Sequence, residues 1–380
     1  MGECEAIVVG AGVAGIMTAL ALQERGASVT MIDRWEPGHP RSASADYNRI
    51  LRCIHGKDEL YTNWVRQARL GWMELQREIG AELFVECGAL IMAGEGHTAW
   101  EDATLPTFER LGIPHFRFDT DELRIRFPQF DFQKVAYGIW EPEAGMVMAH
   151  AAVVGGTGLF VRRGGTVQRG RVTCDSAERL HLDGRALEAD VIIVATGAWL
   201  GEMYRRTIAP ISNIVRQNII YTSTPEGDQS YDAANMPCWV DHGMGAYGLP
   251  SINGHGVKAA IAWTHSIIDL DQDDRVVDDA TFTKTRAYIR KRFPGLADQK
   301  AVDQKACQIA MTPDTHFIID CHPEHENVLL LGGDSGHLFK HGPVVGDFAA
   351  GVALREYGTS DRFKINSRTS LSTGDSPSGR

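Results

Sequence analysis

The sequence has no apolar stretch close to the roughly 18 residues that a membrane-spanning helix needs. A first strand is predicted within a few residues of Met1, with Glu3 and Glu5 beside it, which leaves no room for a secretion signal. The chain also lacks a basic excess, because its formal net charge is −11 and its Lys and Arg residues are dispersed. These absences argue against membrane and nucleic-acid partners and favour a cytoplasmic protein.

Cysteine is too irregularly spaced to cross-link the fold or to bind a metal. There are seven cysteines, an odd number, and none form a CxxC pair. We therefore expect no disulfide framework, no zinc site and no other resident metal, with most thiols reduced and buried. No internal repeat is present either. With 380 residues, of which 43% are hydrophobic, the chain is long enough for two domains with sizeable cores.

The strongest signal that is present is a glycine-rich turn between an apolar strand and a helix. Residues 5–9 form the expected strand, and Gly10, Gly12 and Gly15 follow it with GxGxxG spacing. Gly10 permits the tight turn, Gly12 lets the backbone approach a pyrophosphate, and Gly15 lets the helix pack on the strand. Asp33 ends the next apolar run and is placed to bond a ribose hydroxyl. The pattern predicts an ADP-containing cofactor on the helix N-terminus, and a glycine turn that merely packs is the alternative.

Two later segments extend the predicted nucleotide-binding sheet. Residues 189–199 and 328–337 are both apolar runs that end in small or glycine residues. A continuous apolar run is typical of a parallel strand that is buried on both faces. We therefore predict an α/β fold whose Rossmann-like cofactor domain is discontinuous and takes in residues 1–85, 145–205 and 305–365.

The intervening residues 86–144 and 206–304 are predicted to form a second, α+β substrate domain on a mixed sheet. The Ser-, Thr- and Gly-rich residues 366–380 are predicted to be a disordered tail. The other expected elements are a helix over 60–79, helices in two pieces over 102–127, a flexible glycine-rich segment at 155–158, antiparallel strands within 171–182 and further strands within 211–265.

Six segments together carry a more specific pattern than the glycine turn alone. They are Gly10–Gly15 with Asp33, Arg49–Arg52, Ala195–Trp199, Cys307, His316–Asp320 and Gly333–Lys340. In their order they resemble the monomeric sarcosine oxidase and fructosyl amino acid (Amadori) oxidase family of FAD-dependent amine oxidases in the DAO superfamily, and the resemblance runs to about Ile365. It implies FAD as cofactor, a cofactor domain of the glutathione-reductase type, and a monomeric enzyme.

The resemblance also implies how the cofactor is held. Cys307 lies where this family attaches FAD through a thioether, and an ordinary buried thiol is the alternative. Arg49 looks like the family's basic residue near the flavin ring, with a structural ion pair as the alternative. The segment from Gly333 to His337 would place helix N-terminal amides at the flavin, with a tight turn that binds no ligand as the alternative. Further cofactor contacts are implied for Arg34, Ser42, Ala43, Thr196, Gly197, Trp199, Gly336 and Lys340.

On the substrate side the resemblance implies four functional side chains. Arg52 and Lys340 match the clamp on the substrate carboxylate, which two cations in a dry pocket would bind strongly; a solvated surface pair is the alternative. Lys258 matches the lysine over the flavin face, where its charge would stabilise superoxide as the first electron reaches oxygen. A strand lysine facing solvent is the alternative. Tyr247 resembles the active-site tyrosine, with a packing role as the alternative.

The chain departs from sarcosine oxidase near the expected substrate. Ala262 stands where that enzyme has a histidine, and His265 falls on the other face of the predicted strand. The loop over residues 42–49 and the later Gly-Asp-Ser-Gly-His turn look more like those of the Amadori-type oxidases. A bulkier N-substituted amino acid than sarcosine is therefore expected.

These observations favour an FAD-dependent oxidase of a secondary amine or N-substituted amino acid. The carboxylate would dock on Arg52 and Lys340, a hydride equivalent would leave the neutral amine, and O2 would be reduced to hydrogen peroxide beside Lys258. No dedicated general base is obvious in the sequence. An FAD-dependent dehydrogenase that uses another electron acceptor and a non-catalytic dinucleotide-binding protein are the alternatives.

Overall fold

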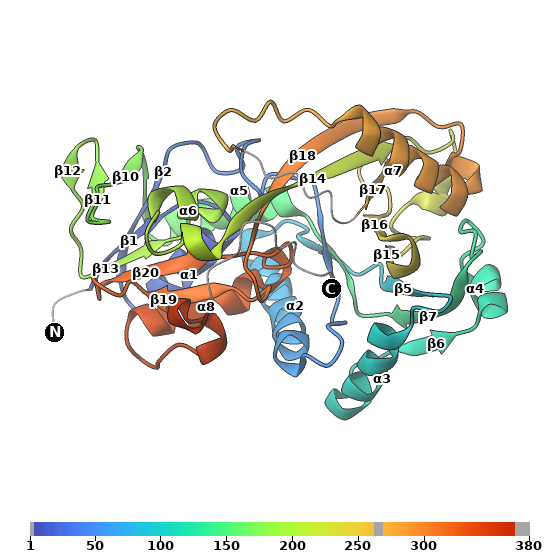
Figure 1. Cartoon of the computed structure of the whole chain (residues 1–380), viewed down its shortest axis with the longest axis horizontal. Helices are drawn as coiled ribbons and strands as arrows, with labels where there is room; N and C mark the ends of the chain where they lie inside the picture. The colour runs from blue at the N-terminus through green and yellow to red at the C-terminus, as the bar shows by residue number, and fades with distance from the viewer. Residues whose placement is uncertain (1–3, 262–268, 369–380) are drawn as a thin grey trace.

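The computed structural model describes residues 4–261 and 269–368, which are arranged around two large β-sheets (Figure 1). Ala262, His265 and residues 369–380 lie outside the described ranges. Within those ranges the chain forms one six-stranded sheet, one eight-stranded sheet and two three-stranded sheets. No helix there is both long and apolar enough to cross a membrane.

The six-stranded sheet is built from distant parts of the chain, as the sequence predicts. Strand β1 pairs in parallel with β2 and β13, and β13 pairs in parallel with β20. In spatial order its strands are β19 (Ile318–Cys321), β20 (Val328–Gly332), β13 (Val191–Val194), β1 (Glu5–Val9), β2 (Ser28–Asp33) and β9 (Thr166–Arg169).

Both faces of this sheet are covered, which explains why its strands are continuous apolar runs. Because side chains alternate along a strand, Val8 and Ile193 face one layer while Val9 and Ile192 face the other. The first layer is made of helices α1 (Val13–Glu24), α2 (Glu59–Ile79), α5 (Ala149–Arg162) and α8 (Gly342–Ala353). The second includes the short helix α6 (Leu200–Met203) and the small sheet of β10 (Val172–Cys174), β11 (Leu180–Leu182) and β12 (Arg185–Ala186).

The glycine turn between β1 and α1 is dictated partly by the protein's own packing. Gly10 has φ of +108°, and a Cβ atom there would lie 2.4 Å from the Ala195 carbonyl oxygen. A Cβ atom on Gly15 would lie 1.9 Å from the Gly10 carbonyl oxygen. Beside Gly12, in contrast, the nearest atom to such a Cβ is Ser44 Oγ at 3.4 Å. Gly10 and Gly15 therefore shape the turn, while Gly12 leaves space beside the backbone.

The eight-stranded sheet is mixed, because β5 pairs in parallel with β15 while the other neighbours are antiparallel. Helices α4 (Thr120–Arg126) and α7 (Asp279–Arg292) pack on one of its faces, and α3 (Ala99–Leu111) packs near the other. Its strands are, in order, β18 (Ala301–Met311), β14 (Asn213–Thr222), β17 (Val257–Ile261), β16 (Ala246–Leu249), β15 (Cys238–Asp241), β5 (Ala89–Gly94), β7 (Val135–Glu141) and β6 (Phe116–Phe118).

The two longest strands of this sheet, β14 and β18, reach across the molecule between the two large sheets (Figure 1). Strand β18 runs without a break through residues 304 and 305, where the sequence analysis places a domain boundary. The boundaries between the two domains stay a prediction. A small sheet of β3 (Arg49–Leu51), β8 (Gly145–Val147) and β4 (Phe84–Val85) completes the fold.

Two local expectations from the sequence were wrong, and a third, the two helices within 102–127, was confirmed but missed a strand. Residues 155–158 are not a flexible segment but part of α5, where a Cβ atom on Gly156 would come within 2.9 Å of an Ile16 methyl group. Gly155 and Gly156 serve close helix packing. The segment over 102–127 contains strand β6 between its two helices. The predicted tail begins too early, because Asn366 and Ser367 form a 3-10 turn and the buried Arg368 pairs with Asp314 at 3.0 Å.

Replacing Gly15 with alanine is expected to destabilise the fold by about 1–3 kcal/mol, because the new methyl group meets a backbone carbonyl that cannot move alone. Gly158→Ala in α5 is the matched control, since its Cβ would have nothing nearer than an Arg162 nitrogen at 3.6 Å. That variant should be neutral or up to about 1 kcal/mol more stable. Urea unfolding of both variants checks the prediction, and equal midpoints would contradict it.

Candidate functional site

A single cavity of about 1100 Å³ joins the glycine turn to the eight-stranded sheet. Of the site residues named from the sequence, Gly15 and Gly333 do not line it, because both are packed inside the protein. The others line its wall: Gly10, Gly12, Asp33, Arg34, Ser42, Ala43, Arg49, Arg52, Thr196, Gly197, Trp199, Tyr247, Lys258, Cys307, Gly336, His337 and Lys340.

The end of the cavity next to β1 has the features of a nucleotide site. The Asp33 carboxylate accepts hydrogen bonds from the backbone N–H groups of Ala11 at 2.7 Å and Trp35 at 2.8 Å, which fixes its position in the wall. The Arg34 guanidinium lies 3.6 Å from the Trp35 ring centre. In the part of the chain that the structure describes, Thr196 Oγ1 and Trp199 Nε1 are buried without hydrogen-bond partners. Buried polar atoms normally have partners, so this wall fits a bound dinucleotide.

The register of the eight-stranded sheet gathers the other candidate residues on one face. Cys307 on β18 is paired with Gln217 on β14, and Lys258 on β17 is paired with Tyr221 on β14. Paired residues in neighbouring strands point to the same side, as do residues two apart in one strand. Tyr247 on β16 is paired with Ala260, two residues after Lys258, and so joins the same face. The strand alternation thus aims Cys307, Lys258 and Tyr247 into the cavity.

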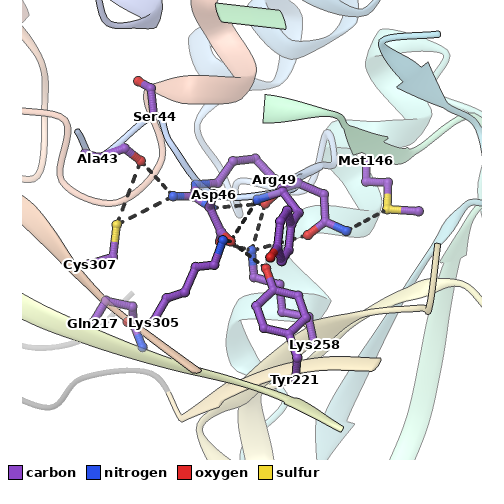
Figure 2. A network of polar contacts seen from close by, with 12 residues as sticks. Ala43, Ser44, Asp46, Arg49, Met146, Gln217, Tyr221, Lys258, Lys305 and Cys307 are labelled. Carbon is purple, nitrogen blue, oxygen red and sulfur yellow. Dashed lines mark hydrogen bonds and ion pairs between the residues drawn. The ribbon is translucent and has the colours of Figure 1, made fainter. Parts of the chain in front are cut away.

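At the centre of this face, one buried carboxylate is shared by several cations (Figure 2). The side chain of Asp46 is 3% exposed and lies 2.6 Å from Lys258 Nζ. It also pairs with Arg49 and accepts a hydrogen bond of 2.5 Å from the Tyr221 hydroxyl, while Lys305 Nζ lies 3.7 Å away. Asp46 has no role in the sequence analysis, although it belongs to the loop over 42–49 that carries the resemblance.

The charges in this cluster depend on one another. Burial alone would raise the pKa of Asp46, but Lys258 and Arg49 outweigh burial and hold that pKa well below its usual value. Burial lowers the pKa of Lys258 to about 8, although Asp46 opposes the change. At neutral pH the Lys258 ammonium is therefore charged, and Asp46 is the group that stabilises its charge.

Cys307 lies beside the same cluster. Its sulfur accepts a contact of 3.5 Å from an Arg49 guanidinium nitrogen, and that guanidinium also donates to the Ala43 carbonyl at 2.7 Å (Figure 2). Burial raises the pKa of the Cys307 thiol, and the nearby Arg49 charge opposes the increase. Cys307 is a free thiol whose contact with the Arg49 cation offsets part of the cost that burial imposes on its thiolate.

Arg52 and Lys340 form a second cationic region in the cavity wall. Lys340 Nζ donates to the Arg52 carbonyl at 3.3 Å; Lys340 is buried and Arg52 is half-buried. Neither lies within 4.0 Å of an acidic group among the described residues. Burial lowers the pKa of both groups. Glu141 holds the backbone after Arg52 by accepting hydrogen bonds from the N–H groups of Cys53 and Ile54 at 2.7 and 3.1 Å.

Three histidines, His55, His337 and His341, meet next to Lys340, a grouping that the sequence analysis did not predict. Their nearest ring nitrogens lie within 4.8 Å of one another, a spacing that could hold a metal ion. Burial lowers the pKa of all three, and the Lys340 charge adds to the effect. The neighbouring charges of Lys340 and Arg52 repel a metal cation, so this wall suits an anionic ligand better.

The prediction of a helix N-terminus at Gly333–His337 was wrong. Helix α8 begins at Gly342, and the 3-10 turn Phe339–His341 precedes it. Gly333, Ser335 and Gly336 all have positive φ angles, which a right-handed helix does not contain. The segment is a loop, in which Gly336 and His337 still line the cavity.

The fold and the cavity together indicate a protein that binds a dinucleotide beside a chamber with charged side chains in its wall. Comparison with known families identifies the group more closely. The model of the family described as FAD dependent oxidoreductase matches residues 5–351, and the chain belongs to this family. FAD is accordingly its cofactor, and the residues around the cavity fit that assignment.

Individual proteins similar to this chain support the family assignment. A monomeric sarcosine oxidase from Bacillus sp. (strain B-0618) is 27% identical over 360 residues, which is 92% of each chain. The structure of L-proline dehydrogenase from P. horikoshii has a TM-score of 0.83 at 19% identity and covers 96% of this chain and 97% of its own. Fructosyl peptide oxidase from E. terrenum also has a TM-score of 0.83 at 19% identity, with coverages of 96% and 92%. These similarities confirm the predicted fold class.

Asp46→Asn is expected to destabilise the protein by about 3–5 kcal/mol, because the change leaves buried Arg49 and Lys258 without their shared counter-charge. Urea unfolding at pH 7 measures the effect. The exposed pair of Asp361 and Lys364 provides the control, and Asp361→Asn should leave the unfolding midpoint unchanged. An Asp46→Asn protein as stable as the parent would show that the cluster does not need its carboxylate.

Proposed function

We propose that this FAD-dependent oxidoreductase oxidises the C–N bond of a secondary amine or N-substituted amino acid to an imine, with O2 reduced to hydrogen peroxide. The observation that carries the proposal is the pairing of two cationic regions in one cavity. One region, at Arg52 and Lys340, lacks a counter-ion among the described residues, and the other holds a charged lysine on the sheet face. FAD, when bound, supplies the two-electron acceptor between amine and oxygen.

Arg52 and Lys340 are proposed to bind the substrate carboxylate. Burial disfavours both charges and the nearby Glu141 carboxylate offsets this only in part, so a substrate carboxylate that bridges the two cations would relieve the remaining cost. Arg52 can bind a carboxylate through two parallel hydrogen bonds, which also sets its direction. The clamp would hold the C–H bond next to the nitrogen in a fixed orientation and would select amino acids over simple amines.

Lys258 is proposed to assist the reaction with oxygen. The ammonium is 1% exposed and points from β17 into the cavity. A fixed positive charge in a dry site stabilises negative charge that develops on oxygen, and it needs no reorganisation at that moment. A dehydrogenase that uses another electron acceptor has no need of this charge, which favours the oxidase. Tyr247 lies on the same face and is proposed to close the chamber beside the substrate.

Cys307 is proposed as the residue that binds FAD covalently. Its sulfur lies in the cavity wall against Arg49. Cys307 is on the edge strand β18, and Tyr247 lies three strands away on β16. Attachment needs the thiolate form, and the Arg49 guanidinium is placed to favour it. A monomeric state and a cytoplasmic location remain predictions from the sequence.

After acid precipitation, flavin absorbance is expected to stay with the protein pellet of the parent and to move to the supernatant for Cys307→Ala. Cys307→Ala should lose the flavin because, among the cysteines in the described ranges, only Cys307 both lines the cavity and contacts Arg49. Cys321→Ala, on β19 and away from the cavity wall, is the control and should keep its flavin in the pellet. Release of flavin from the parent protein would make Cys307 an ordinary buried thiol.

Lys258→Met is expected to slow reoxidation of the reduced enzyme by O2 about 100-fold or more, while anaerobic reduction by substrate changes only a few-fold. Stopped-flow absorbance measures the two steps separately. Lys284→Met removes an exposed lysine on α7 and should alter neither step. Equal losses in both steps would remove the proposed role of Lys258.

The same experiment has a pH readout. Because burial lowers the pKa of Lys258 to about 8, the ammonium loses its proton as the pH rises from 7 to 9. The reoxidation rate constant of the parent should fall over this range, whereas that of Lys258→Met should stay flat.

One molecule of hydrogen peroxide formed for each molecule of substrate oxidised would exclude the dehydrogenase alternative.

A further inference from the structure

A carboxylate and an imidazole form a pair in the cavity wall that the proposed reaction does not use. Glu101 lies in the first turn of α3, and His242 begins the 3-10 turn His242–Met244 after β15. The Glu101 carboxylate contacts His242 Nδ1, and both residues line the cavity. The two residues are 141 positions apart in the sequence, so no sequence motif indicates the pair.

The pair leaves one hydrogen-bonding atom free. A buried carboxylate on Nδ1 favours the tautomer in which that nitrogen carries the proton, so that Nε2 is an acceptor. Glu101 is 1% exposed, whereas the His242 side chain is 27% exposed. No group in the described ranges bonds His242 Nε2. The pair therefore presents an acceptor at the cavity.

The pair stands in line with the proposed carboxylate clamp. The Arg52 guanidinium carbon lies 5.8 Å from the centre of the Trp100 ring, and that ring lies 4.7 Å from the His242 ring. One wall therefore carries, in order, a cation, an apolar indole and a hydrogen-bond acceptor. A ligand with its carboxylate on Arg52 would extend along Trp100 towards His242.

We propose that Glu101 and His242 form a second anchor for the substrate, in which His242 accepts a hydrogen bond from a hydroxyl or N–H donor on the N-substituent. The inference rests on the proposed function and narrows its substrate class to amino acids whose N-substituent carries such a donor. Glu101 is a positioning residue that holds the His242 tautomer. Discrimination arises because an alkyl group placed there leaves the buried pair without its partner.

Two pairs of isosteric glycine derivatives test the anchor. N-(2-hydroxyethyl)glycine is compared with N-propylglycine, and N-(3-hydroxypropyl)glycine with N-butylglycine, by anaerobic flavin reduction of the holoenzyme. In at least one pair the parent should prefer the hydroxyl compound about tenfold or more in reduction rate at limiting substrate. His242→Asn keeps a donor for Glu101 but has no atom in place of Nε2, so the preference should fall below about threefold.

Variants at neighbouring positions separate recognition from folding. Glu101→Gln should weaken the preference in the same direction, because the glutamine amide no longer fixes the His242 tautomer. Asp102 is adjacent on α3 and bonds Thr98 and Tyr137 outside the cavity wall, so Asp102→Asn should keep the full preference. Asp102→Asn should also leave reduction by the alkyl compounds unchanged.

The outcomes keep this inference distinct from the proposed function. Equal reduction by the hydroxyl and alkyl compounds of both pairs would overturn the second anchor and leave the amine oxidation intact. A His242→Asn protein that loses activity towards both kinds of compound would assign the pair a structural role and also overturn the anchor. Failure of every compound to reduce the flavin would overturn the proposed function itself.

Discussion

The buried carboxylate of Asp46 is the interaction on which the centre of the protein depends. Arg49 and Lys258 come from different sheets, and both are withdrawn from water, where an unpaired charge is costly. Asp46 compensates both, and the Tyr221 hydroxyl completes its hydrogen bonding. Because the loop of Asp46 belongs to the nucleotide side and Lys258 to the eight-stranded sheet, the same carboxylate also ties the two halves of the cavity together. The geometry of the cofactor site and of the sheet face are therefore set by one ionic cluster.

The cations in the cavity differ in whether they have an acidic partner, and this difference explains their different proposed roles. Lys258 has a built-in counter-ion in Asp46, which supports its charge at neutral pH and suits a role in stabilising charge on oxygen. Arg52 and Lys340 have no such partner among the described residues, and burial works against their charges. A bound carboxylate is the natural compensation, so binding energy and specificity concentrate at that end. The Glu101–His242 pair lies farther along the same wall, where it can distinguish substrates by their N-substituents.

Particular residues show where sequence reasoning succeeded and where it failed. The glycine turn and the apolar strands were predicted correctly because they depend on local sequence patterns. The glycines at 155–158 misled, because Gly155 and Gly156 pack closely against α2 and α1, and composition does not reveal a packing partner. The segment at 333–337 also misled, since its positive φ angles break the helix that the pattern of glycines suggests. The ion pair of Asp46 with Lys258 and the grouping of His55 with His337 and His341 were not predicted, because each joins residues far apart in the sequence.

By itself, the sequence determined the nucleotide-binding turn and the buried parallel strands, since each follows from local steric rules and side-chain periodicity. Only the tertiary structure decided which charges are compensated. Asp46 meets Lys258 across 212 positions, and Glu101 meets His242 across 141. Electrostatic interactions and desolvation depend on distance and burial in three dimensions, so the states of these groups, and the chemistry they support, are set by how the two sheets come together.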